Sequence, residues 1–213
     1  MSAQPLRRIA VLVSGRGTNL QSILNAVGSG ALDAEVVAVL SNRKEAQGLV
    51  RAREAGVEAI YLDPRQYGDR DAFDRAMAKE LRDRDVDLVC LAGYMRLVGA
   101  ELLGGFAGRM LNIHPSLLPS FPGLEAQRQA LDYGVKVSGA TVHLVTAELD
   151  GGPIVLQSSV PVLSGDTIES LSARILVEEH RLYPEAIRAV LAGGWRIEGR
   201  RFVHPVRSDD SSE

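Results

Sequence analysis

A continuous apolar run near the start of the chain is the feature that most narrows its possible folds. Residues 9–13 read Ile-Ala-Val-Leu-Val, which is typical of a parallel strand buried on both faces. A segment with two glycines, residues 14–19, follows this run, and apolar residues then recur at positions 20, 23, 24 and 27. That spacing predicts an amphipathic helix. A strand, a glycine turn and a helix in this order form the first unit of a doubly wound α/β fold.

The alternation of apolar runs and helical patterns continues to residue 113. Further strands are expected at residues 36–40, 59–62, 86–91 and 110–113, and helices at residues 46–55 and 71–84. Strands joined by helices imply right-handed crossovers and parallel pairing. We therefore expect an α/β protein with a Rossmann-like, doubly wound and mostly parallel sheet.

The pattern changes after residue 120. A helix is expected at residues 124–132, and two strands at residues 139–145 and 154–160 then follow one another without a helix between them. Consecutive strands of this kind predict an antiparallel C-terminal edge on the parallel sheet.

The last part of the chain reads as a long helix and a small hairpin. The helix is expected to start at Asp166, with Glu169 at the N3 position of a capping box. Pro184 should kink or restart this helix, because proline removes a backbone donor from its interior. A hairpin is expected at residues 195–203, around a glycine turn.

Length and composition favour one folded domain. The chain has 213 residues, of which 46% are hydrophobic, so residues 1–207 are expected to form a single domain and the polar residues 208–213 a frayed tail. The net charge of −3 is spread over 24 basic and 27 acidic residues, which gives no footprint of a nucleic-acid binder. No apolar run reaches the roughly 20 residues that cross a bilayer, and the N-terminal run is too short for a secretion signal. We therefore expect a cytoplasmic protein with no membrane partner.

The single cysteine, Cys90, lies inside an apolar run and is expected to be a buried, inert thiol. One cysteine allows neither an intrachain disulfide nor a cysteine-based zinc site. The histidines also lack metal-ligand spacing, so we expect no metal; they are His114, His143, His180 and His204.

The glycine loop between the first strand and the first helix is a candidate anion site. Gly15 and Gly17 let the backbone approach a ligand closely, and the helix that follows presents free amides at its positive end. A dinucleotide fingerprint would need a third glycine where Leu20 stands. A monophosphate site is therefore favoured, and a plain tight turn remains an alternative.

Asn112 and His114 form the most suggestive pair of polar residues. They lie two positions apart, so they point to the same side of a strand, and Pro115 should end that strand directly after His114. Ligands bind at such strand ends in open α/β sheets. An amide and an imidazole aimed at one point can hold an oxyanion and exchange a proton, although a lone histidine at a strand end is often structural.

Asp150 is the best candidate for a carboxylate that steers the imidazole. It precedes two glycines in a turn, where aspartate is also common for purely structural reasons. A serine hydrolase using Ser116 is an alternative, but the glycine-flanked elbow that such a serine needs is absent. His143 shares a strand face with apolar neighbours and is expected to support the site or fill the core. Glu179 and His180 are expected, from the helical pattern alone, on a solvated face.

Four segments share their order and spacing with one known family. They are residues 14–20 (Ser-Gly-Arg-Gly-Thr-Asn-Leu), 92–96 (Ala-Gly-Tyr-Met-Arg), 111–119 (Leu-Asn-Ile-His-Pro-Ser-Leu-Leu-Pro) and 148–154 (Glu-Leu-Asp-Gly-Gly-Pro-Ile). Together they closely resemble the folate-dependent phosphoribosylglycinamide formyltransferases of purine synthesis. The resemblance covers about residues 9–191. It implies transfer of a formyl group from 10-formyltetrahydrofolate, as cosubstrate, to the amine of glycinamide ribonucleotide.

The resemblance also implies roles for individual residues. Asn112, His114 and Asp150 would be the catalytic trio. The substrate phosphate and ribose would be bound by Gly17, Thr18, Asn19 and Glu179. The folate pocket would be lined by Arg70, Met95, Arg96, Leu97, Val98, Asn112, Ala147, Glu148, Leu149 and Asp150. The chain departs from the family pattern at Leu176, where a polar residue is usual, and at residues 124–127, where relatives often carry histidines.

Three rival functions remain open at this point. A methionyl-tRNA formyltransferase would be expected to carry a further tRNA-binding domain and a basic surface. A formyltetrahydrofolate hydrolase would be expected to carry an N-terminal regulatory domain. A non-catalytic nucleotide-binding module would use the glycine loop alone, and it leaves Asn112, His114 and Asp150 without a role. The expected partners are the two small-molecule substrates, with monomer and homodimer both open.

Overall fold

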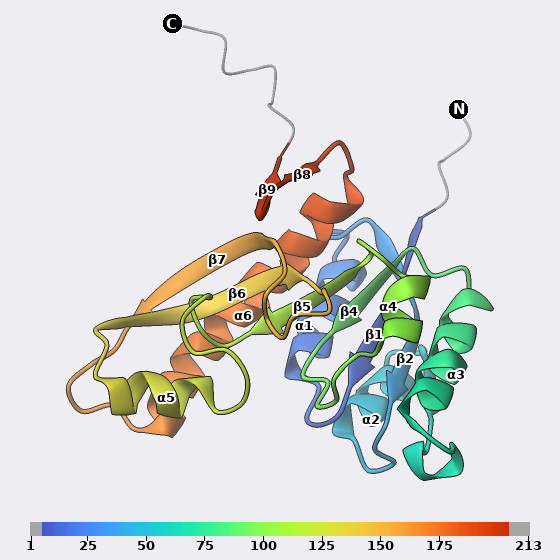
Figure 1. Cartoon of the computed structure of the whole chain (residues 1–213), viewed down its shortest axis with the longest axis horizontal. Coiled ribbons are helices and arrows are strands. Elements are labelled where there is room, and N and C mark those ends of the chain that lie inside the picture. Colours follow the sequence, from blue (N-terminus) through green and yellow to red (C-terminus); the bar gives the residue numbers. More distant parts are fainter. Residues whose placement is uncertain (1–5, 205–213) are drawn as a thin grey trace, which may run out of the picture.

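The computed structural model describes residues 6–204, and a mixed nine-stranded sheet forms the centre of this part of the chain (Figure 1). The strands are β1 (Arg7–Val13), β2 (Ala34–Ser41), β3 (Glu58–Tyr61), β4 (Leu88–Leu91), β5 (Met110–His114), β6 (Val137–Leu144), β7 (Ile154–Pro161), β8 (Arg196–Glu198) and β9 (Arg201–Val203). Their order in the sheet is β3-β2-β1-β4-β5-β6-β7-β9-β8. The first five strands pair in parallel, whereas β6 is antiparallel to both β5 and β7. The predicted fold class, a mostly parallel doubly wound sheet with an antiparallel C-terminal edge, is confirmed.

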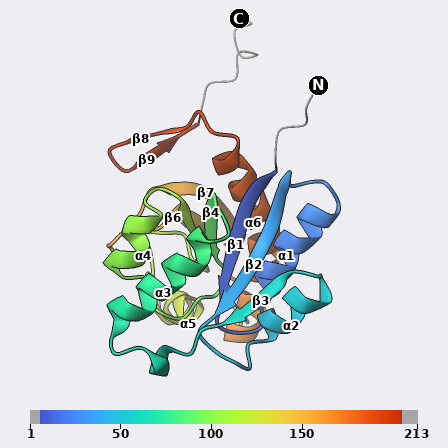
Figure 2. The ribbon, with the colours of Figure 1, turned by 90° about the vertical axis from the view of Figure 1, so that its right-hand side faces the viewer.

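Helices cover both faces of the sheet (Figure 2). Their bounds are α1 (Thr18–Gly28), α2 (Gln47–Glu54), α3 (Arg70–Arg82), α4 (Ala100–Gly105), α5 (Ala126–Tyr133) and α6 (Ile168–Leu191). Alternate residues of β1 divide between two cores: Val11 packs with α1, α2 and α6, and Leu12 packs with α3 and α4. Because β1 is buried on both faces, its continuous apolar run is explained.

The structure corrects several expectations about the helices. The six-residue helix α4 and a 3-10 turn at Pro64–Gln66 were not predicted. Helix α6 is capped by Thr167, whose hydroxyl pairs with Ser170, and not by Asp166 with Glu169. Asp166 lies one residue too early, and its carboxylate instead binds Arg174 at 2.8 Å. Proline 184 lies inside α6 without dividing it.

The C-terminal hairpin is confirmed as β8 and β9. Arg201 in β9 pairs with Ile154 at the start of β7, so the hairpin extends the edge of the main sheet. The predicted tail at residues 208–213, and the domain boundary at residue 207, lie outside the described residues. The single-domain expectation for residues 1–207 therefore stays a prediction.

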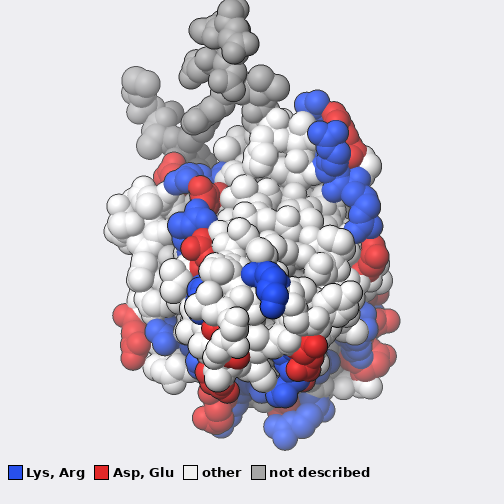
Figure 3. Space-filling model, turned by 90° about the vertical axis from the view of Figure 1, so that its left-hand side faces the viewer, with Lys and Arg blue, Asp and Glu red and all other residues white. Residues whose placement is uncertain are grey.

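Charge and apolarity are distributed as in an ordinary folded domain. On the face shown in Figure 3, acidic and basic residues are interspersed around the rim and uncharged residues occupy much of the middle.

Cys90 is fully buried, as expected, and this burial raises the pKa of its thiol. Among residues 6–204, no helix is both long enough and apolar enough to span a membrane.

Candidate active site

The predicted pair Asn112 and His114 lies at the carboxyl end of β5. Both residues point to the same side of the strand, as alternation requires. Asn112 pairs with Leu91 of the parallel strand β4 on one side and with His143 of the antiparallel strand β6 on the other. The site therefore forms where the parallel part of the sheet meets its antiparallel edge.

Asp150 is brought to this strand end by the turn between β6 and β7. Its Oδ2 lies 3.4 Å from Nδ1 of His114 and accepts a hydrogen bond from the backbone N–H of Gly123 at 2.8 Å. Its Oδ1 lies 3.5 Å from Nε2 of His143. The backbone of Asp150 has φ +49°, the left-handed region that aspartate and asparagine enter more readily than most residues. The three predicted catalytic residues are thus brought together, with His143 as a fourth member.

His143 holds the amide of Asn112. Its Nδ1 lies 3.0 Å from the carbonyl oxygen of Leu144, which places the proton on Nδ1 when the ring is neutral. Nε2 is then an acceptor, and it lies 3.1 Å from Nδ2 of Asn112. The expectation that His143 supports the site fits its buried position. Its direct link to Asn112 was missed, because only the register of β5 against β6 places the two residues opposite one another.

The charge state of Asp150 is set by opposing effects. Its side chain is 8% exposed, and burial by itself would raise the carboxyl pKa. The nearby His143 imidazole, the hydrogen bond from the Gly123 amide and the charge of His114 outweigh burial and hold the pKa of Asp150 below its ordinary value. Asp150 is therefore a carboxylate at neutral pH.

The second ring nitrogen of His114 faces the loop after β5. Nε2 lies 2.8 Å from the backbone carbonyl oxygen of Phe121, so a donor at Nε2 satisfies that contact. The ring thus lies between a carboxylate and a carbonyl. Ser116 takes no part in this arrangement, because its hydroxyl donates to the backbone carbonyl of Ser120. The geometry gives no support to the serine-hydrolase alternative.

The glycine loop is held against α2 by its backbone. Gly17 is the N-cap residue of α1 and has φ +70°, and a Cβ there would lie 2.6 Å from Cα of Gly48. The carbonyl of Gly15 accepts from the Gly48 amide at 3.0 Å, and the carbonyl of Arg16 accepts from Nε of Arg51 at 2.9 Å. Because α2 takes up both carbonyls, they do not line the N-terminus of α1.

Glu179 lies beside this loop and corrects one expectation. Glu179 was expected on a solvated face, but it is only 8% exposed. Its Oε2 accepts a hydrogen bond from Nδ2 of Asn19 at 2.7 Å. Burial raises the pKa of this carboxyl, and the Asn19 hydrogen bond opposes that change. The helical pattern failed here because α1 packs on this face of α6. His180 is half-buried, and burial lowers its pKa.

A cavity of about 450 Å³ opens beside the same loop. It is lined by polar residues of α1, α2 and α6, which are Thr18, Gln21, Ser22, Asn25, Arg51 and His180. Of the predicted phosphate-binding residues, Thr18 lines this cavity, whereas Gly17 and Asn19 are buried and are not among its lining residues.

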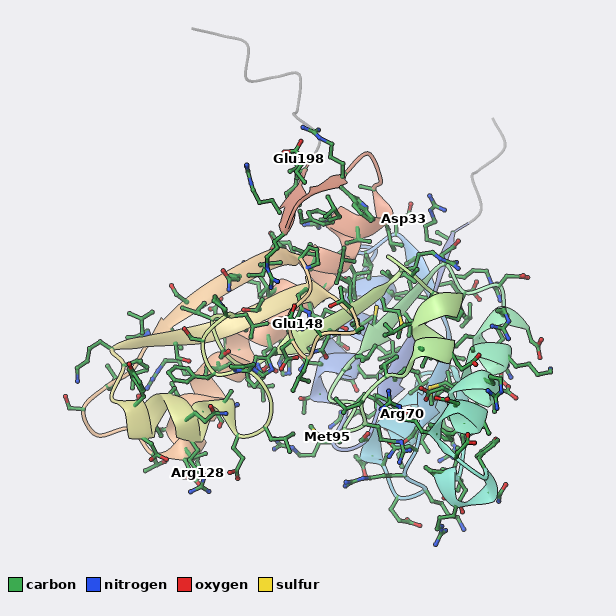
Figure 4. All side chains as sticks on the ribbon, in the orientation of Figure 1. Asp33, Arg70, Met95, Arg128, Glu148 and Glu198 are labelled. Carbon is green, nitrogen blue, oxygen red and sulfur yellow. The ribbon has the colours of Figure 1, made fainter. Side chains whose placement is uncertain are left out.

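The residues expected to line the folate pocket lie in two segments and one helix. Residues 95–98 follow β4, and Met95 and Leu97 are 58% and 60% exposed. Arg70 on α3 reaches this segment, since its Nη2 donates to the carbonyl of Val98 at 3.4 Å; Arg70 and Met95 are labelled in Figure 4. Residues 147–149 are exposed in the turn that carries Asp150, with Glu148 also labelled there.

Comparisons with known proteins fit this arrangement. A model of the formyl transferase family matches residues 7–187. A phosphoribosylglycinamide formyltransferase from Escherichia coli is 44% identical, over 92% of this chain and 90% of its own length. The chain belongs to the phosphoribosylglycinamide formyltransferase family. The crystal structure of glycinamide ribonucleotide transformylase 1 from Symbiobacterium toebii superposes with a TM-score of 0.92 at 60% identity, covering 93% of this chain and 94% of that one.

Some members of this formyltransferase family are much longer proteins. The trifunctional purine biosynthetic protein adenosine-3 of Gallus gallus is 44% identical over 89% of this chain, yet the chain spans only 19% of that protein.

The two departures from the family pattern occupy different settings. Leu176 is half-buried on α6, and Leu124 is 76% exposed in the loop before α5. Within the described part of the chain, no group of three or more His, Cys, Asp or Glu side chains could hold a metal ion.

Proposed function

We propose that this protein transfers the formyl group of 10-formyltetrahydrofolate to the primary amine of glycinamide ribonucleotide. The observation that carries the proposal is the convergence of an amide, an imidazole and a carboxylate at the end of β5. His114 lies 3.4 Å from Asp150, and His143 links Asn112 to the same carboxylate, since its Nε2 lies 3.1 Å from the Asn112 amide and 3.5 Å from Asp150. The glycine loop follows β1 and residues 95–98 follow β4, so both lie at the carboxyl ends of neighbouring strands.

The phosphate of the ribonucleotide would bind at the N-terminus of α1. Among residues 6–204 no side chain caps this helix, and its N-cap residue is Gly17, so the first amides are available to an anion. Thr18 adds a half-buried hydroxyl at the same position. Glu179 lies on the neighbouring helix α6 and is held by the hydrogen bond from Asn19. Its carboxyl group would accept a hydrogen bond from a ribose hydroxyl.

The cosubstrate would lie along residues 95–98, with its formyl group directed toward Asn112 and His114. Arg70 supports the same segment and carries a half-exposed guanidinium suited to an acidic group of the folate. The turn at residues 147–150 would close the other side. These assignments place both ligands at one end of the sheet.

The transfer needs no covalent enzyme intermediate. The substrate amine attacks the formyl carbon, the new C–N bond forms, and the carbonyl oxygen becomes an oxyanion. Asn112 uses one Nδ2 hydrogen on His143, and its second hydrogen remains for this oxyanion. His114 would donate from Nε2 once the oxyanion replaces the Phe121 carbonyl as its partner. A well-placed oxyanion donor contributes roughly 3–4 kcal/mol.

The tetrahedral intermediate collapses when the bond to the folate nitrogen breaks. The proton lost by the attacking amine must reach that nitrogen, so that one N–H bond breaks and another forms. The carboxylate of Asp150 lies 3.4 Å from the His114 ring and would orient it and relay this proton, directly or through water. Acid–base assistance of this kind contributes a factor of about 10²–10⁴ in rate.

A direct assay tests the proposed function. Purified protein is mixed with 10-formyltetrahydrofolate and glycinamide ribonucleotide, and release of tetrahydrofolate and formation of the formylated ribonucleotide are both followed. We expect equal amounts of the two products and dependence on both substrates. Release of formate with water as the acceptor would instead make the protein a hydrolase, and absence of any turnover would refute the proposal.

A further inference from the structure

The segment formed by residues 95–98, here called the folate strap, is attached to the protein at both ends by buried polar groups. Among residues 6–204, no hydrogen bond engages the backbone amides of Arg96, Leu97 and Val98. The amides immediately before and after these three are both bonded, one to Ser14 and the other to Asp74. A run of unengaged amides between two fixed points is suited to a ligand that carries acceptor atoms.

Ser14 provides the first attachment. It is 3% exposed and directly follows β1. Its Oγ accepts from the backbone N–H of Met95 at 2.8 Å and donates to Oδ1 of Asn42 at 2.6 Å. Its own backbone N–H donates to the carbonyl of Gly93 at 3.1 Å. One hydroxyl thus joins the ends of β1, β2 and β4, and Ser14 is also the residue before the glycine loop.

Asp74 provides the second attachment. This α3 residue is 2% exposed, and its Oδ2 accepts from the backbone N–H of Gly99 at 2.6 Å. A Cβ at position 99 would lie 2.5 Å from the same oxygen, which explains the glycine. Nε of Arg70 lies 4.0 Å from Oδ2, and the same guanidinium donates to the Val98 carbonyl. Asp74 therefore fixes both the strap and the arginine beside it.

Burial destabilises the charged form of Asp74, so the groups around its carboxylate have to compensate for the loss of water. Burial raises the pKa of Asp74, while the Gly99 amide and the charges of Arg70 and Arg96 oppose that change. Arg96 is itself held over the ring of Phe73, with its guanidinium carbon 4.9 Å from the ring centroid. The described hydrogen bond and ion pair of this carboxylate are thus both made with residues beside the strap.

We propose that Ser14 and Asp74 are positioning residues. By fixing the two ends of the folate strap, they hold its backbone in the position that binds the folate cosubstrate and thereby determine affinity for it. This inference rests on the proposed function, because it takes residues 95–98 as the surface that binds the pteridine ring. The two residues contact different parts of the site. Asp74 contacts only the strap side of the site, whereas Ser14 also fixes the start of the loop expected to bind the ribonucleotide phosphate.

The experiment compares Asp74→Ala, Asp74→Asn and Ser14→Ala with the wild type. We expect Asp74→Ala to raise the KM for 10-formyltetrahydrofolate about tenfold or more, with kcat and the KM for glycinamide ribonucleotide within about threefold, since a buried hydrogen bond to a charged group is lost. Asp74→Asn keeps an oxygen for Gly99 and should lie between the two. Ser14→Ala should raise both KM values.

Matched controls and a second readout separate positioning from general damage. Arg82→Ala in the last turn of the same helix and Ser29→Ala at the end of α1 alter exposed side chains and should leave both KM values unchanged. Amide hydrogen exchange should speed up at Met95 in Ser14→Ala and at Gly99 in Asp74→Ala. Calorimetric titration with tetrahydrofolate should show the same loss of affinity as the kinetics.

Unchanged tetrahydrofolate affinity in Asp74→Ala and Ser14→Ala, or an equal loss for both substrates in Asp74→Ala, would overturn the inference. The conservative Asp74→Asn variant keeps the test decisive if Asp74→Ala does not fold: Asp74→Asn must then weaken tetrahydrofolate binding and speed up exchange at Gly99. A wild-type protein without turnover would refute the proposed function alone. Exchange and tetrahydrofolate binding would still decide the role of the two attachments.

Discussion

The side-chain amide of Asn112 donates to Nε2 of His143 over 3.1 Å, and the two residues lie directly opposite one another on β5 and β6. Because Nδ1 of His143 faces the Leu144 carbonyl, Nε2 can only accept when the ring is neutral. That requirement turns the NH2 group of Asn112, and not its oxygen, toward the histidine. It follows that His143 fixes the amide in the orientation that leaves one N–H for the oxyanion.

His143→Phe tests this dependence. The phenyl ring fills the buried space but offers no acceptor, so the Asn112 amide is free to rotate and kcat should fall about 10- to 100-fold. The KM values for both substrates should change little. His143→Gln restores an acceptor oxygen and should recover part of the rate. A steady-state comparison of the two variants decides the matter, because equal rates for both would remove the orienting role.

Asp150→Asn tests the carboxylate. Asparagine tolerates φ +49° and can still accept from the Gly123 amide, so the fold should survive while the charge beside His114 is lost. We expect kcat to fall about 10²- to 10³-fold with both substrates still bound. Asp85→Asn is the matched control, since Asp85 is exposed and also has φ +49°. A rate close to wild type for Asp150→Asn would refute the assigned role.

The parts of the site that sequence predicted depend on local chain geometry. Asn112 and His114 share a face because strand residues alternate, and β5 ends at His114, directly before Pro115. The glycine loop directly before α1 likewise follows from a strand, two glycines and a helical pattern in sequence. Such features need no knowledge of which distant segments meet.

The parts that were missed depend on long-range packing. The partnership of His143 with Asn112 requires the register of two antiparallel strands, and the burial of Glu179 requires α1 to pack on α6. Neither is encoded in the spacing of nearby residues. Helix α4 was missed for a different reason, because its six residues include two glycines and only Leu102 is buried among them.

The buried carboxyl of Glu179 should give stability a specific dependence on pH. Its pKa is raised above the ordinary value of 4.5 by burial, so the folded state binds this proton more tightly than the unfolded chain. The contribution to stability is therefore complete below pH 4.5 and is lost as pH rises through the folded-state pKa. The slope from this one group cannot exceed about 1.4 kcal/mol per pH unit.

Glu179→Gln isolates that contribution. The amide keeps an acceptor for Asn19 but does not titrate, so the difference in unfolding free energy between wild type and variant should change with pH in this direction. Urea denaturation at several pH values between 4 and 8 measures it. A difference that stays constant across this range would contradict the raised pKa.

Gly17→Ala should damage the glycine loop more than a methyl group does elsewhere. Its φ of +70° disfavours any residue with a Cβ, and the new methyl would lie 2.6 Å from Cα of Gly48, a backbone atom that cannot rotate away. We expect a loss of about 2 kcal/mol or more in unfolding free energy and a raised KM for glycinamide ribonucleotide. Gly28→Ala, at the other end of α1, meets no atom within 4 Å and provides the control. Denaturation and steady-state kinetics on both variants check the prediction, which is wrong if the two substitutions have the same effect.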